Sequence, residues 1–145
     1  MAALKRFSDL ESSPLLQAAL GRLLRSGVLD RELGRLRNEL RARHAAARAQ
    51  LARAMPAGVR WSEPEGGLSL WVELPRGCDA RRVATAAARD GVLVVPGDAF
   101  HPRSRSVAGF RLSFSRAPLD VIAPGIEVLA RHVRSETDPR ADGRA

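Results

Sequence analysis

The stretch that decides the fold is Gly109-Phe110-Arg111-Leu112-Ser113-Phe114-Ser115, a short alternating run in the last third of the chain. The apolar side chains at positions 110, 112 and 114 fall on one face of an extended strand. Arg111, Ser113 and Ser115 fall on the other face. One face of this strand is therefore expected to pack into a core, and the opposite face is polar.

Arg111 is the candidate functional residue of this strand. A guanidinium held on a strand can offer two parallel N–H donors to a carboxylate, a geometry that a loop arginine loses through backbone motion. The alternative is an ordinary solvated strand arginine, because exposed arginines are common on protein surfaces. The pattern alone leaves both interpretations open.

Length and composition favour one soluble domain. The chain has 145 residues, of which 45% are hydrophobic, so it can bury a core. Cys78 is the only cysteine, which excludes an internal disulfide and fits a reducing cytoplasm. The N-terminus lacks an apolar stretch long enough for a signal peptide or a membrane span. We therefore expect a cytoplasmic protein with no membrane partner.

Two helices are predicted before any strand. Ser13-Pro14 supplies an N-cap and a first-turn proline, and the apolar stripe that follows ends at Gly27. Asp30 opens a longer helix, which runs to about Met55 with apolar residues at helical spacing. A further short amphipathic helix is expected over residues 1–11.

Beyond the long helix the hydrophobic period becomes extended. Residues 59–61 and 68–74 are predicted strands, close enough in sequence to pair antiparallel. Asp79 caps a helix over residues 80–90, and residues 92–95 read as a buried strand.

The C-terminal part completes the fold prediction. Composition predicts a mobile loop over residues 98–108. Pro118 suits the first turn of a last helix, whereas Pro124 would remove a hydrogen bond, so we expect a kink or a new helix start there. Residues 135–145 are predicted to be a disordered tail. The order of elements predicts an α+β fold, a small, largely antiparallel sheet covered by helices and preceded by a long helix.

The long helix is also the best case for nucleic-acid binding. The formal net charge is +8 at pH 7, and many arginines lie on this helix. A basic helix can neutralise phosphates, but it has few side chains that read bases, and acidic residues interrupt it. The simpler interpretation is a solvated outer face. His44 has no second ligand at metal spacing, so no metal site is predicted.

Five segments, taken in order, carry a resemblance: residues 12–20, 33–43, 64–71, 91–100 and 111–115. Together they resemble the C-terminal part of fold-type I, pyridoxal-phosphate-dependent class I/II aminotransferases. Within that superfamily the chain is most similar to the aminoadipate-type enzymes and to the aminotransferase-like effector domain of MocR-type transcription regulators. The resemblance covers about residues 3–134.

The resemblance implies domain limits and one binding residue. Residues 1–29 would be a helical segment linking from a missing large domain, residues 30–134 the small domain, and residues 135–145 the tail. Arg111 would grip the α-carboxylate of an amino acid or 2-keto acid substrate. The complete protein would bind pyridoxal 5'-phosphate and form a homodimer. No catalytic, cofactor-binding or metal-binding residue is assigned to this chain.

One departure from the family limits the expected activity. The family binds its cofactor through a lysine in a Ser-x-x-Lys loop of the large domain. The only lysine here is Lys5, which has Ala2 three residues before it and no such loop around it. We therefore expect a C-terminal fragment of an aminotransferase that contributes carboxylate binding and is inactive alone.

Two alternatives stay open. The first is the effector-sensing domain of a MocR/GntR-type transcription regulator, which would meet nucleic acid only through an upstream DNA-binding domain. The second is a basic protein that binds nucleic acid through its long helix. The identity of the amino-acid substrate cannot be read, because the side-chain pocket would lie mostly in the missing part.

Overall fold

The computed structural model describes residues 13–100 and 107–138. The helix expected over residues 1–11 lies outside the described residues. The chain divides into two compact units, Met1–Glu39 and Leu40–Ala145. This division falls inside the long helix, ten residues beyond the domain limit expected at residue 30. No helix among the described residues is long and apolar enough to cross a membrane.

Helix α2 (Pro14–Arg25) begins at its proline, as predicted. Ser13 makes no side-chain capping bond, so the proline in the first turn is the main start signal. The helix ends at Ser26, whose amide donates to the carbonyls of Arg22 and Leu23. Gly27 follows with φ of +67°, a conformation that favours glycine, so the predicted helix end is confirmed.

Helix α3 (Val28–Ala54) begins two residues before the predicted start at Asp30. The reason is a cap supplied by Ser26, whose Oγ accepts a hydrogen bond from the Val28 amide at 3.4 Å. The helix therefore follows α2 almost directly. In the second unit, its last turns bury Ala47, Gln50 and Leu51.

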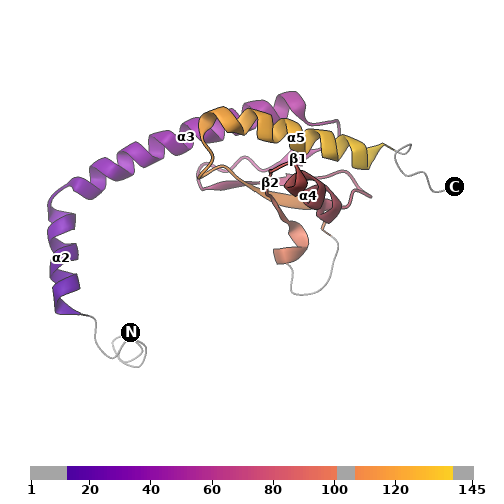
Figure 1. The fold of residues 1–145 in the computed structure, drawn as a ribbon. Helices are drawn as coiled ribbons and strands as arrows, with labels where there is room; N and C mark the ends of the chain where they lie inside the picture. The colour runs from indigo at the N-terminus through magenta and orange to yellow at the C-terminus, as the bar shows by residue number, and fades with distance from the viewer. Residues whose placement is uncertain (1–12, 101–106, 139–145) are drawn as a thin grey trace. The chain divides into compact units, whose positions relative to one another are not determined.

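The second unit contains a four-stranded antiparallel sheet, as predicted (Figure 1). Its strands lie in the order β1-β2-β4-β3, with bounds β1 Arg60–Trp61, β2 Ser69–Glu73, β3 Val95–Pro96 and β4 Gly109–Ser113. The strands predicted over residues 59–61 and 68–74 do pair, through Trp61 opposite Val72.

The register of β2 and β4 separates the two faces of the sheet. Leu70 pairs with Leu112, and Val72 with Phe110, and all four side chains are buried. The alternate pair, Trp71 with Arg111, lies on the opposite face. The alternation predicted for residues 109–115 is therefore confirmed.

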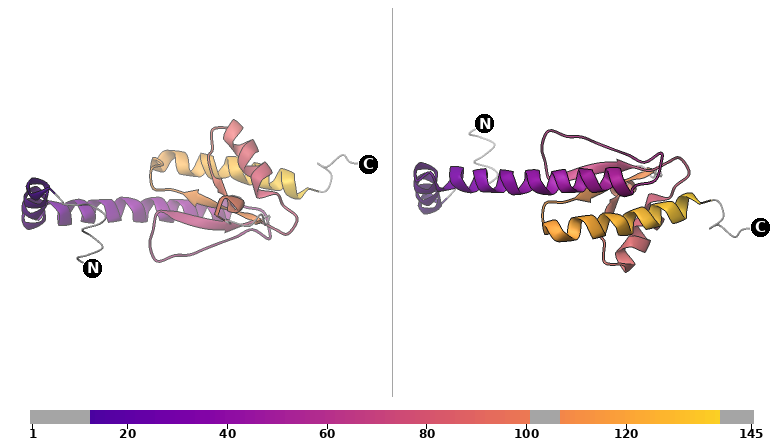
Figure 2. Two further views of the ribbon diagram at one scale, coloured as in Figure 1. Left: turned by 90° about the horizontal axis from the view of Figure 1, so that it is seen from below. Right: turned by 90° about the horizontal axis from the view of Figure 1, so that it is seen from above.

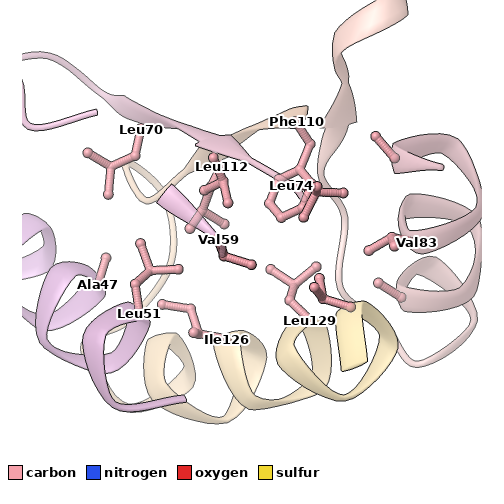
Figure 3. Close-up of a cluster of buried hydrophobic side chains, with 14 of the residues drawn as sticks. Ala47, Leu51, Val59, Leu70, Leu74, Val83, Phe110, Leu112, Ile126 and Leu129 are labelled. Carbon is pink, nitrogen blue, oxygen red and sulfur yellow. The ribbon is translucent and has the colours of Figure 1, made fainter. Parts of the chain in front are cut away.

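Helices α3, α4 (Ala80–Arg89) and α5 (Leu119–Thr137) cover the buried face (Figure 2). Figure 3 shows side chains of these helices meeting those of the strands in one cluster. Its largest fully buried members are Phe110, Leu51, Leu70, Ile126, Leu129, Val72, Val83 and Val133. Asp79 caps α4 as predicted, because its carboxylate accepts from the amides of Arg81 and Arg82. None of these three helices covers the opposite face of the sheet, which carries Arg111; this face is called the open face below.

The strand predicted over residues 92–95 is wrong for its first part. Only Val95 and Pro96 form β3, and Leu93 is 81% exposed. The reason is that these residues close the preceding helix instead. Gly91 takes φ of +81°, and the Val92 amide donates to the Ala87 carbonyl at 2.9 Å.

Two other expectations about the C-terminal part need correction. Of the kink or new helix start expected at Pro124, the new start is wrong, because α5 runs through Pro124 as one helix. The proline is exposed and lies near the N-terminal end, where one lost hydrogen bond costs least. The disordered tail expected from residue 135 is wrong for residues 135–137, because α5 extends to Thr137. The hydroxyl of Thr137 donates to the carbonyls of Val133 and Arg134, each at 3.0 Å. Residues 139–145 lie outside the described residues.

The segment expected to be a loop over residues 98–108 is in part regular. Residues Gly97–Phe100 form a short 3-10 helix, η1, and residues 101–106 lie outside the described residues. In Figure 1, η1 lies on the side of the sheet away from α3 and α5. It is therefore an element on the open face.

Candidate functional site

Arg111 is exposed on the open face of β4, one of the two inner strands of the sheet. Its register partners are Trp71 on β2 and Val95 on β3. The neighbours Phe110 and Leu112 are buried on the other face and fix the strand against the helices. Within residues 13–100 and 107–138, no carboxylate forms an ion pair with the Arg111 guanidinium. Its charge is therefore available to a ligand.

Two aromatic side chains accompany Arg111. The guanidinium carbon of Arg111 lies over the Phe100 ring, 5.1 Å from its centroid. The ring of Trp71 meets that of Phe100 edge to face, with centroids 6.3 Å apart and an interplanar angle of 74°. Phe100 comes from η1, so the group joins three elements: β2, β4 and η1.

Glycines make room for the Trp71 ring. A Cβ atom at Gly109 would lie 3.0 Å from Cζ2 of Trp71, and one at Gly97 would lie 2.8 Å from its Cη2. The indole therefore crosses β4 at a position without a side chain and reaches the end of β3. Any larger residue at Gly97 or Gly109 would displace it.

Ser113 and Ser115, the two serines predicted to share the face of Arg111, form hydrogen bonds at the end of β4. Ser113 Oγ donates to the Leu68 carbonyl at 3.2 Å and lies 3.2 Å from Ser115 Oγ. The Ser115 carbonyl accepts a hydrogen bond from Arg43 of α3 at 2.9 Å. These bonds hold the end of β4. Arg60 and Glu73 also lie on the open face but pair with each other at 3.6 Å, whereas Arg111 has no ion-pair partner among the described residues.

The described residues do not fit a covalently bound pyridoxal cofactor. They include no lysine, because Lys5, the only lysine of the sequence, lies outside them. No group of three or more His, Cys, Asp or Glu side chains among residues 13–100 and 107–138 is placed to hold a metal ion. The chemistry that these residues can offer is recognition of an anion by Arg111.

Arg35, Arg48 and Arg53 of α3 have acidic partners. Arg35 pairs with Glu32 and Glu39 within the helix, and the hydrogen bond to Glu32 together with both charges raises the pKa of its guanidinium. In the second unit, Arg48 pairs with Glu63 at 2.5 Å and Arg53 with Glu127 at 3.3 Å. These pairs favour a solvated, ion-paired helix surface over a phosphate-binding one.

His44 is a half-buried residue that packs against an aromatic ring. Its ring stacks on that of Phe114, with centroids 5.3 Å apart and an interplanar angle of 26°. The contact attaches α3 to the residue that follows β4.

Comparison with known proteins gives partial matches that cover nearly all of this chain. Aromatic-amino-acid aminotransferase 1 of Thermococcus litoralis is 32% identical over 132 residues, which are 91% of this chain and 32% of that protein. The 2-aminoadipate transaminase of Thermus thermophilus is 32% identical over 130 residues, 90% of this chain and 32% of that protein. No family model matches the chain.

A solved structure supports the same relationship. The kynurenine aminotransferase of Pyrococcus horikoshii superimposes with a TM-score of 0.84 and 32% identity, over 94% of this chain and 34% of that one. The chain is homologous to the C-terminal, small-domain part of class I aminotransferases. It spans about a third of the length of these relatives.

This aminotransferase small domain also occurs in regulators. The HTH-type transcriptional regulator YdcR of Escherichia coli, which is uncharacterized, is 35% identical over 97 residues, 67% of this chain and 21% of that protein. The chain is therefore similar to part of an enzyme and to part of a regulator.

The sequence pattern predicts that Arg111 lies on the polar face of its strand, but not that Trp71 and Phe100 lie beside it. A signal for Trp71 was present, since the alternation of residues 68–74 places this tryptophan between Ser69 and Glu73 on the polar face. A large aromatic residue on a polar strand face indicates a ligand or another segment above it. No comparable local signal exists for Phe100, because its contacts depend on how η1 folds back.

Proposed function

We propose that this chain is the part of a pyridoxal-phosphate-dependent aminotransferase that binds the α-carboxylate of an amino acid or 2-keto acid through Arg111. The observation that carries the proposal is an exposed guanidinium without a carboxylate partner among the described residues, on an inner strand whose other face is buried. An arginine on a packed strand can present its planar fork to a carboxylate with little loss of order.

The remaining parts of the site belong to a large domain outside this chain. In this proposal that domain supplies the lysine and the other groups that hold pyridoxal 5'-phosphate, the complete protein is a cytoplasmic homodimer, and the chain alone is inactive. The relationship supports it, because the Thermus thermophilus aminotransferase LysN, 31% identical, was solved with N-(5'-phosphopyridoxyl)-L-leucine. Bound cofactor supplies the electron sink for transamination. Arg111 would orient the substrate through its carboxylate.

A fusion protein tests the role of Arg111. This chain replaces the matching third of the Thermus thermophilus 2-aminoadipate transaminase, and amino-acid affinity is measured from the cofactor absorbance. Hydrogen bonds to charged groups contribute about 1.5–3 kcal/mol, so Arg111→Ala should weaken binding by roughly 10- to 150-fold. Arg111→Lys should recover only part, because an ammonium cannot make a planar two-point contact.

The matched control is Arg60→Ala, since Arg60 is also a strand arginine but pairs with Glu73 at 3.6 Å. It should leave affinity unchanged. The proposal is wrong if Arg111→Ala also leaves affinity unchanged, or if amines without a carboxylate bind the parent fusion as well as amino acids do.

The second candidate function is the effector domain of a transcription regulator. The similarity to YdcR favours it, as does a 31% identity over 134 residues to the HTH-type regulator YisV of Bacillus subtilis. Arg111 would then bind the carboxylate of an effector. Sequencing the coding region upstream of Met1 separates the two functions: a helix-turn-helix segment would identify the regulator, and a large domain without one the enzyme.

A further inference from the structure

We propose that Phe100 and Trp71 are positioning residues, which hold the Arg111 guanidinium in the orientation that receives a carboxylate. This inference rests on the proposed function of Arg111 and adds two residues to it. Neither residue is expected to touch the reacting atoms.

Arg111 needs an orienting contact to present its guanidinium to a ligand. A free arginine side chain has large rotamer freedom, which must be lost when it binds a ligand with two parallel bonds. No carboxylate among the described residues fixes the Arg111 side chain. The contact that the structure provides is the Phe100 ring, with its centroid 5.1 Å from the guanidinium carbon.

An aromatic ring can orient a guanidinium without an ion pair. The ring face attracts the cation through its quadrupole and does not neutralise its charge, as an aspartate or glutamate would. The positive charge of Arg111 therefore stays available for an anionic ligand. Phe100 is 46% exposed, so the contact lies at the surface, where a ligand can reach the same guanidinium.

Phe100 is itself held in place by Trp71. Its ring meets that of Trp71 edge to face, at 6.3 Å between centroids. Trp71 cannot move toward the sheet, because its ring already lies against the backbone at Gly97 and Gly109. The order of contacts thus runs from the sheet backbone to Trp71, then to Phe100, and from there to Arg111.

The register of the sheet also places Trp71 beside Arg111. Trp71 and Arg111 are direct partners across β2 and β4, so their Cα positions are fixed by the strand ladder. Phe100 bridges the two side chains from η1. We infer that η1 is the element that pre-organises the arginine, which reduces the entropy lost on ligand binding.

The test has one readout on Arg111 itself and one on ligand binding. The order parameter of the Arg111 Nε–Hε group is measured by ¹⁵N relaxation in the whole 145-residue chain, for the parent, Phe100→Leu and Phe100→Trp. Phe100→Leu keeps the apolar bulk but removes the ring, so the order of Arg111 should fall while that of Arg60 stays the same. Phe100→Trp should restore it, because tryptophan attracts cations at least as well.

The second readout uses the fusion protein described above. The energy of an exposed cation–π contact is equivalent to a factor of about two to five in a dissociation constant. Phe100→Leu should therefore weaken amino-acid binding by that factor, and Phe100→Trp should not. Trp71→Leu should give the same loss through Phe100. Unchanged amide spectra of the variants establish that the sheet remains folded.

The two proposals fail in different ways. If Phe100→Leu changes neither the order of Arg111 nor affinity, while Arg111→Ala weakens binding, the positioning role is wrong and the carboxylate role stands. If Arg111 loses order in Phe100→Leu but Arg111→Ala leaves affinity unchanged, the contact is structural and both functional assignments are overturned.

Discussion

Gln50 of α3 donates a hydrogen bond from Nε2 to Oε1 of Glu127 on α5, at 3.0 Å. Gln50 is only 6% exposed. Removing its acceptor therefore leaves a buried amide without this partner, so Glu127→Ala should lower the free energy of unfolding by about 1–3 kcal/mol. The combination with Gln50→Leu should cost less than the sum of the single variants, because both remove the same bond. Urea unfolding of the four proteins in this cycle measures the coupling.

A matched surface pair provides the control for this prediction. Arg60 and Glu73 are 3.6 Å apart, with side chains that are 83% and 52% exposed. Their cycle should give a coupling of about 0–1 kcal/mol, because solvent screens exposed pairs. Equal coupling energies in the two cycles would contradict a special role of the Gln50 bond.

Truncation of Leu129 should lower the free energy of unfolding far more than truncation of Leu93. Leu129 on α5 is 0% exposed and lies in the core, whereas Leu93 is 81% exposed. Leu129→Ala should cost about 2–5 kcal/mol of unfolding free energy, and Leu93→Ala less than about 0.5 kcal/mol. Thermal or urea unfolding measures both. A large loss in Leu93→Ala would instead support the buried strand that the sequence pattern predicts over residues 92–95.

The buried thiol of Cys78 should make stability depend on pH. Burial, and then the negative charge of Glu136, raise the pKa of Cys78 above its ordinary value of 9.0. The thiol therefore ionises at lower pH in the unfolded chain than in the folded one. Stability should be unaffected well below pH 9.0 and should fall as pH rises through the folded-state pKa, by at most about 1.4 kcal/mol per pH unit.

Cys78→Ala is the comparison for this effect, because it removes the titrating group. The difference in unfolding free energy between parent and variant should be constant at neutral pH and should shrink in alkaline solution. A difference that stays constant up to pH 11 would show that the thiol does not ionise more easily on unfolding.

Helix α2 should drive association of the chain. It buries none of its residues, and Leu16, Leu20 and Leu23 are 69%, 55% and 44% exposed at helical spacing. An apolar helix face left in water favours contact with a large domain or a second copy. Light scattering should detect oligomers that a Leu16→Gln, Leu20→Gln, Leu23→Gln variant loses, whereas Leu93→Gln keeps them. A parent that is a monodisperse monomer at high concentration would contradict this prediction.

The parts of the fold that could be predicted from the sequence are those governed by local rules. The alternation at Phe110, Arg111 and Leu112 fixed which face is buried, and Asp79 and Gly27 marked helix ends through their own side-chain or backbone chemistry. Residues 92–94 were misread because an apolar run does not say whether a strand or a helix end uses it, and here the helix end leaves Leu93 exposed. The outcome there was decided by one long-range fact, that β3 pairs with β4 only at Val95 and Pro96.

The candidate site was predictable to the same extent. Arg111 stands in a strand whose polarity is readable, so its exposure followed from the pattern. Phe100 lies eleven residues earlier in a short helix, and no periodicity indicates that its ring returns to the strand. Contacts that depend on the path of a loop have no signature in the local sequence.

The outer strands of the sheet have a consequence for misassembly. Each is only two residues long, and β3 ends in Pro96, which has no backbone N–H to offer a further strand. Natural sheets use short edge strands and prolines in them to prevent pairing with strands of other molecules. Addition of a strand from another copy is therefore disfavoured at both edges of this sheet.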